Sequence, residues 1–142
     1  NSISLNGVST TFTLHNDTLF IETGNLESGK ESTLEIVYET DLAFGILQTP
    51  DRQYWTSSEP YATAHYLPGY IHPRNQIQID TEFNLPTKYE VVAPGKLVSE
   101  IKNATNTRKT VHFSTNSKIS ITDFKSISFK PLKKTSPFEG FG

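Results

Sequence analysis

Histidine and acidic side chains are the groups of this chain that could carry catalysis or bind a metal, because the chain has no cysteine. His65 and His72 lie seven residues apart around a Pro-Gly bend and could share a metal ion, but no third ligand follows at a suitable spacing. The H-E-x-x-H pattern, which puts two zinc ligands and a general base on one helix, does not occur. Phosphate-binding Gly-rich loops and the G-x-S-x-G motif are missing as well. We therefore expect no metal site in this chain and no self-contained enzyme.

Aromatic side chains are concentrated in residues 51–74, a stretch that also contains three prolines. Such a cluster could form a stacking platform for sugar rings or a peptide. The alternative is that the rings pack within their own loop and against a neighbouring sheet. The aromatic residues of the cluster are Tyr54, Trp55, Tyr61, Tyr66 and Tyr70.

Size and composition restrict the classes of protein to which the chain can belong. Its 142 residues suffice for one domain, and no apolar stretch approaches the ~20 residues of a membrane-spanning helix. Residues 1–71 carry nine acidic and two basic side chains, whereas residues 72–142 carry six acidic and eleven basic ones. The pI near 6.1 argues against a nucleic-acid-binding surface, because such domains usually have a pI above ~9.

The elements that would position these residues are β-strands. From Gln76 to Leu85, apolar side chains and Thr alternate with polar ones, and this period of two indicates a strand with one buried face. Shorter alternating segments occur along the rest of the chain, and no window has the spacing of an amphipathic helix. These segments contain Phe12 and Leu14, Leu19 and Ile21, Leu34, Ile36 and Tyr38, Val111 and Phe113, Ile119 and Ile121, and Ile127 and Phe129.

Turn-forming residue pairs separate these segments and favour hairpin connections. The pairs are Asn6-Gly7, Asn16-Asp17, Gly24-Asn25, Ser28-Gly29 and Pro94-Gly95. We therefore predict an all-β fold, an antiparallel β-sandwich with little or no helix. We expect a single β domain over residues 1–132, followed by a flexible linker or tail at residues 133–142.

One segment carries a family resemblance. Residues 58–73, SEPYATAHYLPGYIHP, resemble the region just before the catalytic domain in the aminopeptidase N family of zinc metallopeptidases, which includes leukotriene hydrolase. The family has a Gln-x-Glu-Pro element followed by a Leu-Pro or Phe-Pro pair and a final Pro, fourteen residues after the Glu. The same interval of fourteen separates Glu59 from Pro73, and the Leu67-Pro68 pair stands at the matching place. The resemblance covers roughly residues 14–100.

The resemblance implies a fold, a partner and a site. In the family this region is a saddle-shaped N-terminal β domain that leans on a separate zinc domain, so we expect zinc in that domain and not in this chain. Glu59 would anchor the free α-amine of a peptide substrate, with Ser57, Ser58 and Pro60 as neighbouring substrate-binding residues. A buried ammonium requires such a carboxylate, because an unpaired buried charge costs several kcal/mol.

The segment also departs from the family pattern. Ser57 stands where the family has a Gln, Ala64 where it has an Arg, Gly69 where it has a Cys and Ile71 where it has an Asp. The Arg and the Asp are lost together, which leaves no unpaired charge and fits a diverged but folded domain. These losses keep open the alternative of a peptidase-like scaffold without activity that binds proteins. The aromatic cluster keeps open a second alternative, an unrelated sandwich that binds carbohydrate.

Overall fold

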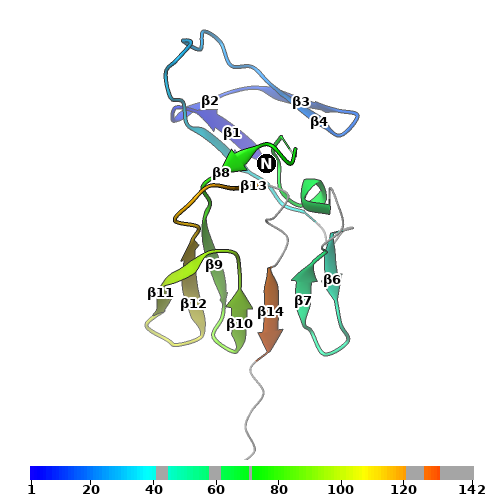
Figure 1. Cartoon of the computed structure of the whole chain (residues 1–142), viewed down its shortest axis with the longest axis vertical. Coiled ribbons are helices and arrows are strands. Elements are labelled where there is room, and N and C mark those ends of the chain that lie inside the picture. The colour runs from blue at the N-terminus through cyan, green and yellow to red at the C-terminus, as the bar shows by residue number, and fades with distance from the viewer. Residues whose placement is uncertain (41–44, 58–61, 71, 121–126, 132–142) are drawn as a thin grey trace, which may run out of the picture. The chain divides into compact units, whose positions relative to one another are not determined.

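The computed structural model describes residues 1–40, 45–57, 62–70, 72–120 and 127–131 (Figure 1). The fold is all-β with several antiparallel sheets, as predicted; strands make up 49% and helical residues 3%. No helix in these ranges has the length and hydrophobicity needed to cross a membrane. The chain divides into two compact units, Asn1–Asp41 (unit 1) and Leu42–Gly142 (unit 2). The expected tail at 133–142 lies outside the described residues, and the single domain over 1–132 stays a prediction.

Unit 1 consists of a three-stranded sheet, in the order β2-β1-β5, and a separate hairpin of β3 and β4 (Figure 1). Its strands are β1 (Ser2–Leu5), β2 (Val8–Ser9), β3 (Phe12–His15), β4 (Thr18–Ile21) and β5 (Leu34–Val37). The predicted turn at Asn16 and Asp17 joins β3 to β4, with positive φ at both residues (49° and 58°). That conformation is typical of a type I′ turn, whose twist matches the strands of a hairpin.

The apolar face of the three-stranded sheet is thinly covered. Ile3 is directly opposite Ile36 and Leu5 is opposite Leu34, so these four side chains share one face. Among the described residues of unit 1, Ile3 is the one buried hydrophobic side chain. Ile36 is half-buried, but Leu34 and Tyr38 are exposed, because they lie at or beyond the ends of β5. The predicted alternation therefore produces burial only at the centre of this strand.

Unit 2 contains a four-stranded sheet, in the order β10-β14-β7-β6, and a three-stranded sheet, in the order β11-β12-β9 (Figure 1). A two-stranded sheet of β13 and β8 and a short 3-10 helix, η1 (Ala62–His65), complete its described elements. The strands are β6 (Ile46–Gln48), β7 (Tyr54–Thr56), β8 (Gln76–Ile77), β9 (Asp80–Pro86), β10 (Tyr89–Val92), β11 (Lys96–Lys102), β12 (Arg108–Ser114), β13 (Ile119–Ser120) and β14 (Ser128–Pro131).

The core of unit 2 lies where side chains of β9 and β12 meet those of β10 and β14. The Phe83 ring makes edge-on contacts with Phe113 and with Phe129, at centroid distances of 6.3 and 5.4 Å. Such perpendicular aromatic pairs stabilise beyond the apolar area they bury. The buried members of the core are Leu85, Ala93, Val111, Phe113 and Ile127.

The strand predicted from Gln76 to Leu85 is present as two shorter strands, β8 and β9. Its alternation is confirmed, since the odd-numbered side chains from residue 77 are half-buried, Leu85 is buried, and the even-numbered ones are exposed. The break falls at residues 78–79, because the backbone N–H of Ile79 donates to the hydroxyl of Thr115 (2.9 Å). Thr115 N–H in turn donates to the Ile79 carbonyl (3.0 Å), so this contact replaces a strand pairing.

Candidate functional site

The structure describes the residues on either side of the predicted amine-binding segment, Ser57 and Ala62. Ser58, Glu59 and Pro60 lie outside the described residues, so their predicted roles stay predictions. Ser57, which follows β7 directly, is half-buried, and η1 begins at Ala62. The geometry of the site is therefore built from the residues that lead into this segment and out of it.

The entry to the segment is fixed by the last residue of β7. Thr56 N–H donates to the Ile127 carbonyl (2.9 Å), and Ile127 N–H donates to the Thr56 hydroxyl (3.0 Å). Both residues are buried, so these bonds are shielded from water. β7 is also paired on both edges, with β6 and with β14. The chain consequently reaches Ser57 from a strand that is paired along both edges.

Gly45 lies against both ends of the segment. Ser57 N–H donates to the Gly45 carbonyl at 2.7 Å. On the other side, the Ala62 carbonyl oxygen is 2.7 Å from the position that a Cβ on Gly45 would occupy. The backbones at residues 57 and 62 therefore both approach the same glycine.

The exit from the segment is the 3-10 helix η1, which the sequence did not predict. Ala62 is fully buried and Thr63 nearly so. The Thr63 carbonyl accepts the N–H groups of Tyr66 (3.2 Å) and Leu67 (2.9 Å), and Leu67 packs on the core of unit 2. The sequence feature that could have indicated this buried turn is the pair of small residues Ala62 and Thr63, because small side chains allow backbones to approach closely.

The aromatic cluster does not have a uniform environment. Tyr54 and Tyr66 are half-buried, and the Tyr54 hydroxyl accepts a hydrogen bond from the Gln48 amide (3.1 Å). Tyr70 is 74% exposed and stacks on His72 with a centroid distance of 5.8 Å. Tyr61 lies outside the described residues. Trp55 is exposed as well (36%). The described part of the cluster thus combines two half-buried rings with an exposed Trp and one exposed stacked pair.

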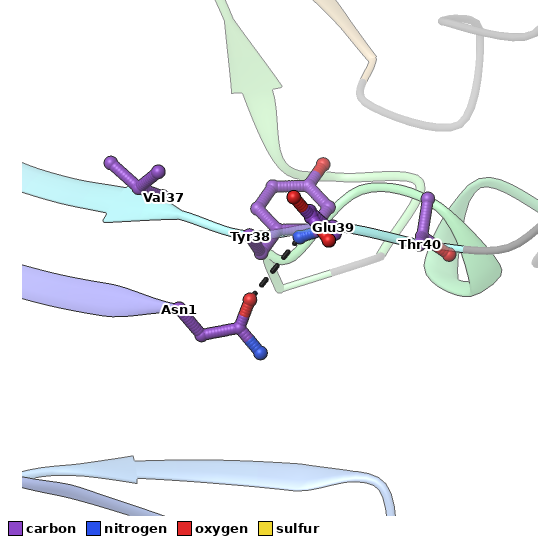
Figure 2. Close-up of a pocket in the computed structure, with 5 residues that line it drawn as sticks. All are labelled: Asn1, Val37, Tyr38, Glu39 and Thr40. Carbon is purple, nitrogen blue, oxygen red and sulfur yellow. Dashed lines mark hydrogen bonds between the residues drawn. The ribbon is translucent and has the colours of Figure 1, made fainter.

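A hollow lies in unit 1, where the sequence analysis placed no site. It has a volume of about 830 Å³ and opens between the start of β1 and the end of β5 (Figure 2). The Asn1 side-chain oxygen accepts the N–H of Glu39 across it (3.2 Å), and burial raises the pKa of Tyr38. Its lining consists of Asn1, Val37, Tyr38, Glu39 and Thr40.

Charged side chains on the outer face of β9 and β12 form a small network. Asp80 Oδ1 lies 3.3 Å from His112 Nε2. A hydrogen bond from Ser114, followed by that from His112, lowers the pKa of the exposed Asp80 carboxyl. Within the described ranges, no three His, Asp or Glu side chains are placed to hold a metal ion. The described residues therefore do not fit a zinc centre.

Sequence comparisons and structure comparisons give different results for this chain. No protein-family model matches it, and no curated protein matches it by sequence. A search of solved structures does find similar folds. One is an M1 zinc metallopeptidase mutant from Deinococcus radiodurans, with a TM-score of 0.74 and 16% identity over 91% of this chain.

Two further solved structures agree with that match. A two-domain M1 zinc metallopeptidase mutant bound to L-tryptophan has a TM-score of 0.71, and one from Deinococcus radiodurans bound to a Tyr-Ser-Ala substrate has 0.72. Each is 16% identical over 91% of this chain, and the chain spans about 31% of their length. The matched part is an N-terminal domain. The resemblance noted in the sequence is thus confirmed in the fold: the chain has the fold of the N-terminal domain of M1 zinc metallopeptidases.

Proposed function

We propose that this chain is the non-catalytic N-terminal domain of an aminopeptidase-N-like zinc metallopeptidase. In this proposal the chain packs on a separate catalytic domain that holds the zinc ion, and both belong to one longer polypeptide, called the parent protein below. Glu59 helps to anchor the free N-terminal amine of a peptide substrate. The chain alone carries out no reaction; zinc, when bound in the other domain, activates water for peptide hydrolysis.

The fold match is the observation that carries the proposal. It covers 91% of this chain but about 31% of the solved metallopeptidases, which fits one domain of a larger enzyme. The fourteen-residue interval from Glu59 to Pro73 adds support, because this spacing is the family's own. The contacts of Gly45 with residues 57 and 62 also support it, since they give the Glu59 segment two fixed ends.

Amine anchoring is a task that a carboxylate can perform from outside the catalytic domain. A substrate with a free N-terminus brings an ammonium group into a narrow site, where it loses its water. A carboxylate at hydrogen-bond distance restores the lost stabilisation with a charge-assisted bond. An N-acetylated peptide has no such charge and gains nothing from Glu59. The proposal therefore predicts selectivity for free amines, which would make the parent protein an exopeptidase.

The test is the hydrolysis of aminoacyl arylamides by the parent protein and its Glu59→Ala variant. We expect the variant to lose about 100-fold in kcat/KM, because removing one partner of a buried ion pair costs about 3 kcal/mol. Glu31→Ala is the matched control, since Glu31 is an exposed loop carboxylate of the same chain. The control should retain wild-type kcat/KM.

Two results would contradict the proposal in different ways. If Glu59→Ala matched the control, the amine-anchoring role would be wrong while the domain assignment stood. If the folded, zinc-loaded parent protein hydrolysed no aminoacyl arylamide, the peptidase assignment would be wrong. The second result would favour the alternative of a peptidase-like scaffold that binds proteins.

A further inference from the structure

We propose that the outer face of the four-stranded sheet of unit 2 is the surface on which the catalytic domain of the parent protein docks. The centre of this surface is a line of exposed apolar side chains, Leu47, Trp55 and Val92, called the apolar row below. The inference rests on the proposed function, because that proposal supplies the second domain. It names the described residues through which the two domains make contact.

The strand register places the apolar row on one face of the sheet. Val92 of β10 is directly opposite Ser128 of β14, and Ser128 is opposite Trp55 of β7. Trp55 is in turn opposite Leu47 of β6. Residues that are directly opposite in an antiparallel sheet point to the same face. The row therefore crosses all four strands, a distance of roughly 14 Å at the usual strand spacing (Figure 1).

This face is turned away from the core of unit 2. Val91 and Phe129 are opposite each other, one position along β10 and β14, and both pack on the core cluster. Because side chains alternate along a strand, the apolar row lies on the other face. The exposed fractions agree: 62% for Val92, 45% for Leu47 and 36% for Trp55. The sheet thus holds three large apolar side chains in line on its solvent-facing side.

The composition of the face indicates a protein partner. The side chains of Leu47 and Val92 carry no polar atoms that could bond the hydroxyl groups of a sugar, which disfavours a carbohydrate. Next to the row on the same face, the exposed Glu90 is directly opposite the exposed Lys130. An apolar centre with a charged rim is the usual composition of a protein interface. Contiguous exposed apolar side chains mark such interaction sites, whereas single ones are ordinary.

Two observations favour the catalytic domain as that partner. Trp55 lies in β7, two residues before Ser57 and four before Glu59, so the row adjoins the segment that the proposed function brings to the active site. Two residues of extended chain span only about 7 Å. The solved metallopeptidases also have a large remainder outside the match, since this chain spans about 31% of their length. A domain that receives Glu59 must therefore also lie close to Trp55.

Ile101 supplies a matched control from the other large sheet of unit 2. It lies in β11 and is 66% exposed, a fraction similar to that of Val92. Its neighbours in the same row are the polar residues Thr110 and Asn84. Ile101 is thus an exposed apolar side chain in a polar row, and we expect it to stay exposed in the parent protein.

The experiment measures the accessibility of introduced cysteines in the zinc-loaded parent protein and in the 142-residue chain. The chain has no cysteine of its own, so Leu47→Cys, Val92→Cys and Ile101→Cys each add one thiol to it. Mass spectrometry of the labelled peptide follows alkylation by iodoacetamide. We expect Leu47→Cys and Val92→Cys to react about 10-fold or more slowly in the parent protein than in the chain, because docking buries them. Ile101→Cys should react at similar rates in both.

The outcomes separate the inference from the proposed function. Equal rates in the parent protein and the chain for Leu47→Cys and Val92→Cys would overturn the inference, while a loss of hydrolysis in Glu59→Ala would still support the proposed function. Slow rates in the chain that rise on dilution would show that a second copy occupies the face, and would also overturn the inference. Protected thiols with a wild-type kcat/KM for Glu59→Ala would support the docking surface and overturn amine anchoring.

A charged substitution gives a second readout that does not depend on alkylation. Val92→Asp should lower kcat/KM of the parent protein for aminoacyl arylamides about 10-fold or more, because docking would bury a carboxylate without a partner. Ile101→Asp, the matched control, should leave kcat/KM unchanged. Thermal unfolding of the 142-residue chain checks that neither variant disturbs this chain itself. Equal effects of the two variants on kcat/KM would overturn the inference.

Discussion

Units 1 and 2 are built from the same kind of antiparallel pairing but differ in what they bury. Among the described residues, unit 1 buries one hydrophobic side chain, Ile3, whereas unit 2 buries six. Unit 1 instead exposes many large hydrophobic side chains and has seven acidic residues against one basic residue. The exposed residues of unit 1 are Val8, Phe12, Leu14, Phe20, Leu26, Leu34, Val37 and Tyr38.

The difference shows that strands can pair through their backbones without forming a buried apolar core. In unit 2, side chains of one sheet pack on those of another, and aromatic rings fill the space between them. In unit 1, the strands pair through their backbones, but the side chains bury little apolar area. Because apolar burial is the main driving force of folding, the stability of this chain should reside in unit 2.

The largest expected effect is obtained by separating the units. A fragment of residues 1–41 should be unfolded, because domains below about 40 residues rarely fold without disulfides, metals or partners. A fragment of residues 42–142 should keep a cooperative transition, since it contains the whole buried cluster. Circular dichroism during thermal unfolding measures both. A cooperative transition in the short fragment would contradict the comparison.

A pair of leucine truncations probes the same difference within the intact chain. Leu85→Ala should lower the free energy of unfolding by about 2–5 kcal/mol, because Leu85 is 6% exposed in the core of unit 2. Leu14→Ala, at a residue of unit 1 that is 72% exposed, should change it by about 0.5 kcal/mol or less. Urea unfolding gives both values. Equal losses would mean that unit 1 buries Leu14 in solution.

Each unit also contains an ion pair, and the two pairs should differ in strength. In unit 2, Lys109 Nζ bonds Glu100 at 3.1 Å, and the two side chains are 6% and 38% exposed. Glu100→Ala should cost about 1–3 kcal/mol, because it leaves a buried ammonium without its partner. Glu27→Ala should cost about 0.5 kcal/mol or less, since Glu27 and Lys30 of unit 1 are about two-thirds exposed. Similar costs in urea unfolding would refute this difference.

The smallest expected effect is on the stability of the folded chain at low pH. The pKa of Asp80 in unit 2 is lowered from its ordinary value of 3.8 by the bonds from Ser114 and His112. A lowered carboxyl pKa stabilises the folded state above the unfolded pKa, and this contribution is lost as the pH falls through the folded value. Asp80→Asn should therefore lose less stability than the wild type between pH 7 and about 3. The measurement is the thermal midpoint of each protein as the pH is lowered. An equal fall in the midpoints of the wild type and the variant would contradict this role of Asp80.

Much of the fold followed from local patterns. The alternation in residues 76–85 predicted which side chains face the core, and the Asn16-Asp17 pair predicted a hairpin turn. The break after β8 could not be predicted, because it depends on Thr115, which is distant in sequence. Lys109 was also missed: a lysine on a strand is expected to be exposed, and its burial depends on the partner that β11 supplies.

The candidate site was less predictable than the fold. The family resemblance pointed to residues 57–60, but no local pattern indicated how the chain enters and leaves that segment. The approach of Gly45 to Ser57 and to Ala62 could not be predicted, because both residues are distant from Gly45 in sequence. η1 was not predicted because four residues are too few to show a helical period.

The central claim, that this domain supplies a carboxylate to an active site in another domain, can be observed directly. The measurement is a crystal structure of the zinc-loaded parent protein with a free amino acid bound. The account predicts a Glu59 carboxylate oxygen about 3 Å from the α-amino nitrogen of the ligand. A Glu59 side chain that faces bulk solvent, with the amine held by the catalytic domain alone, would contradict it.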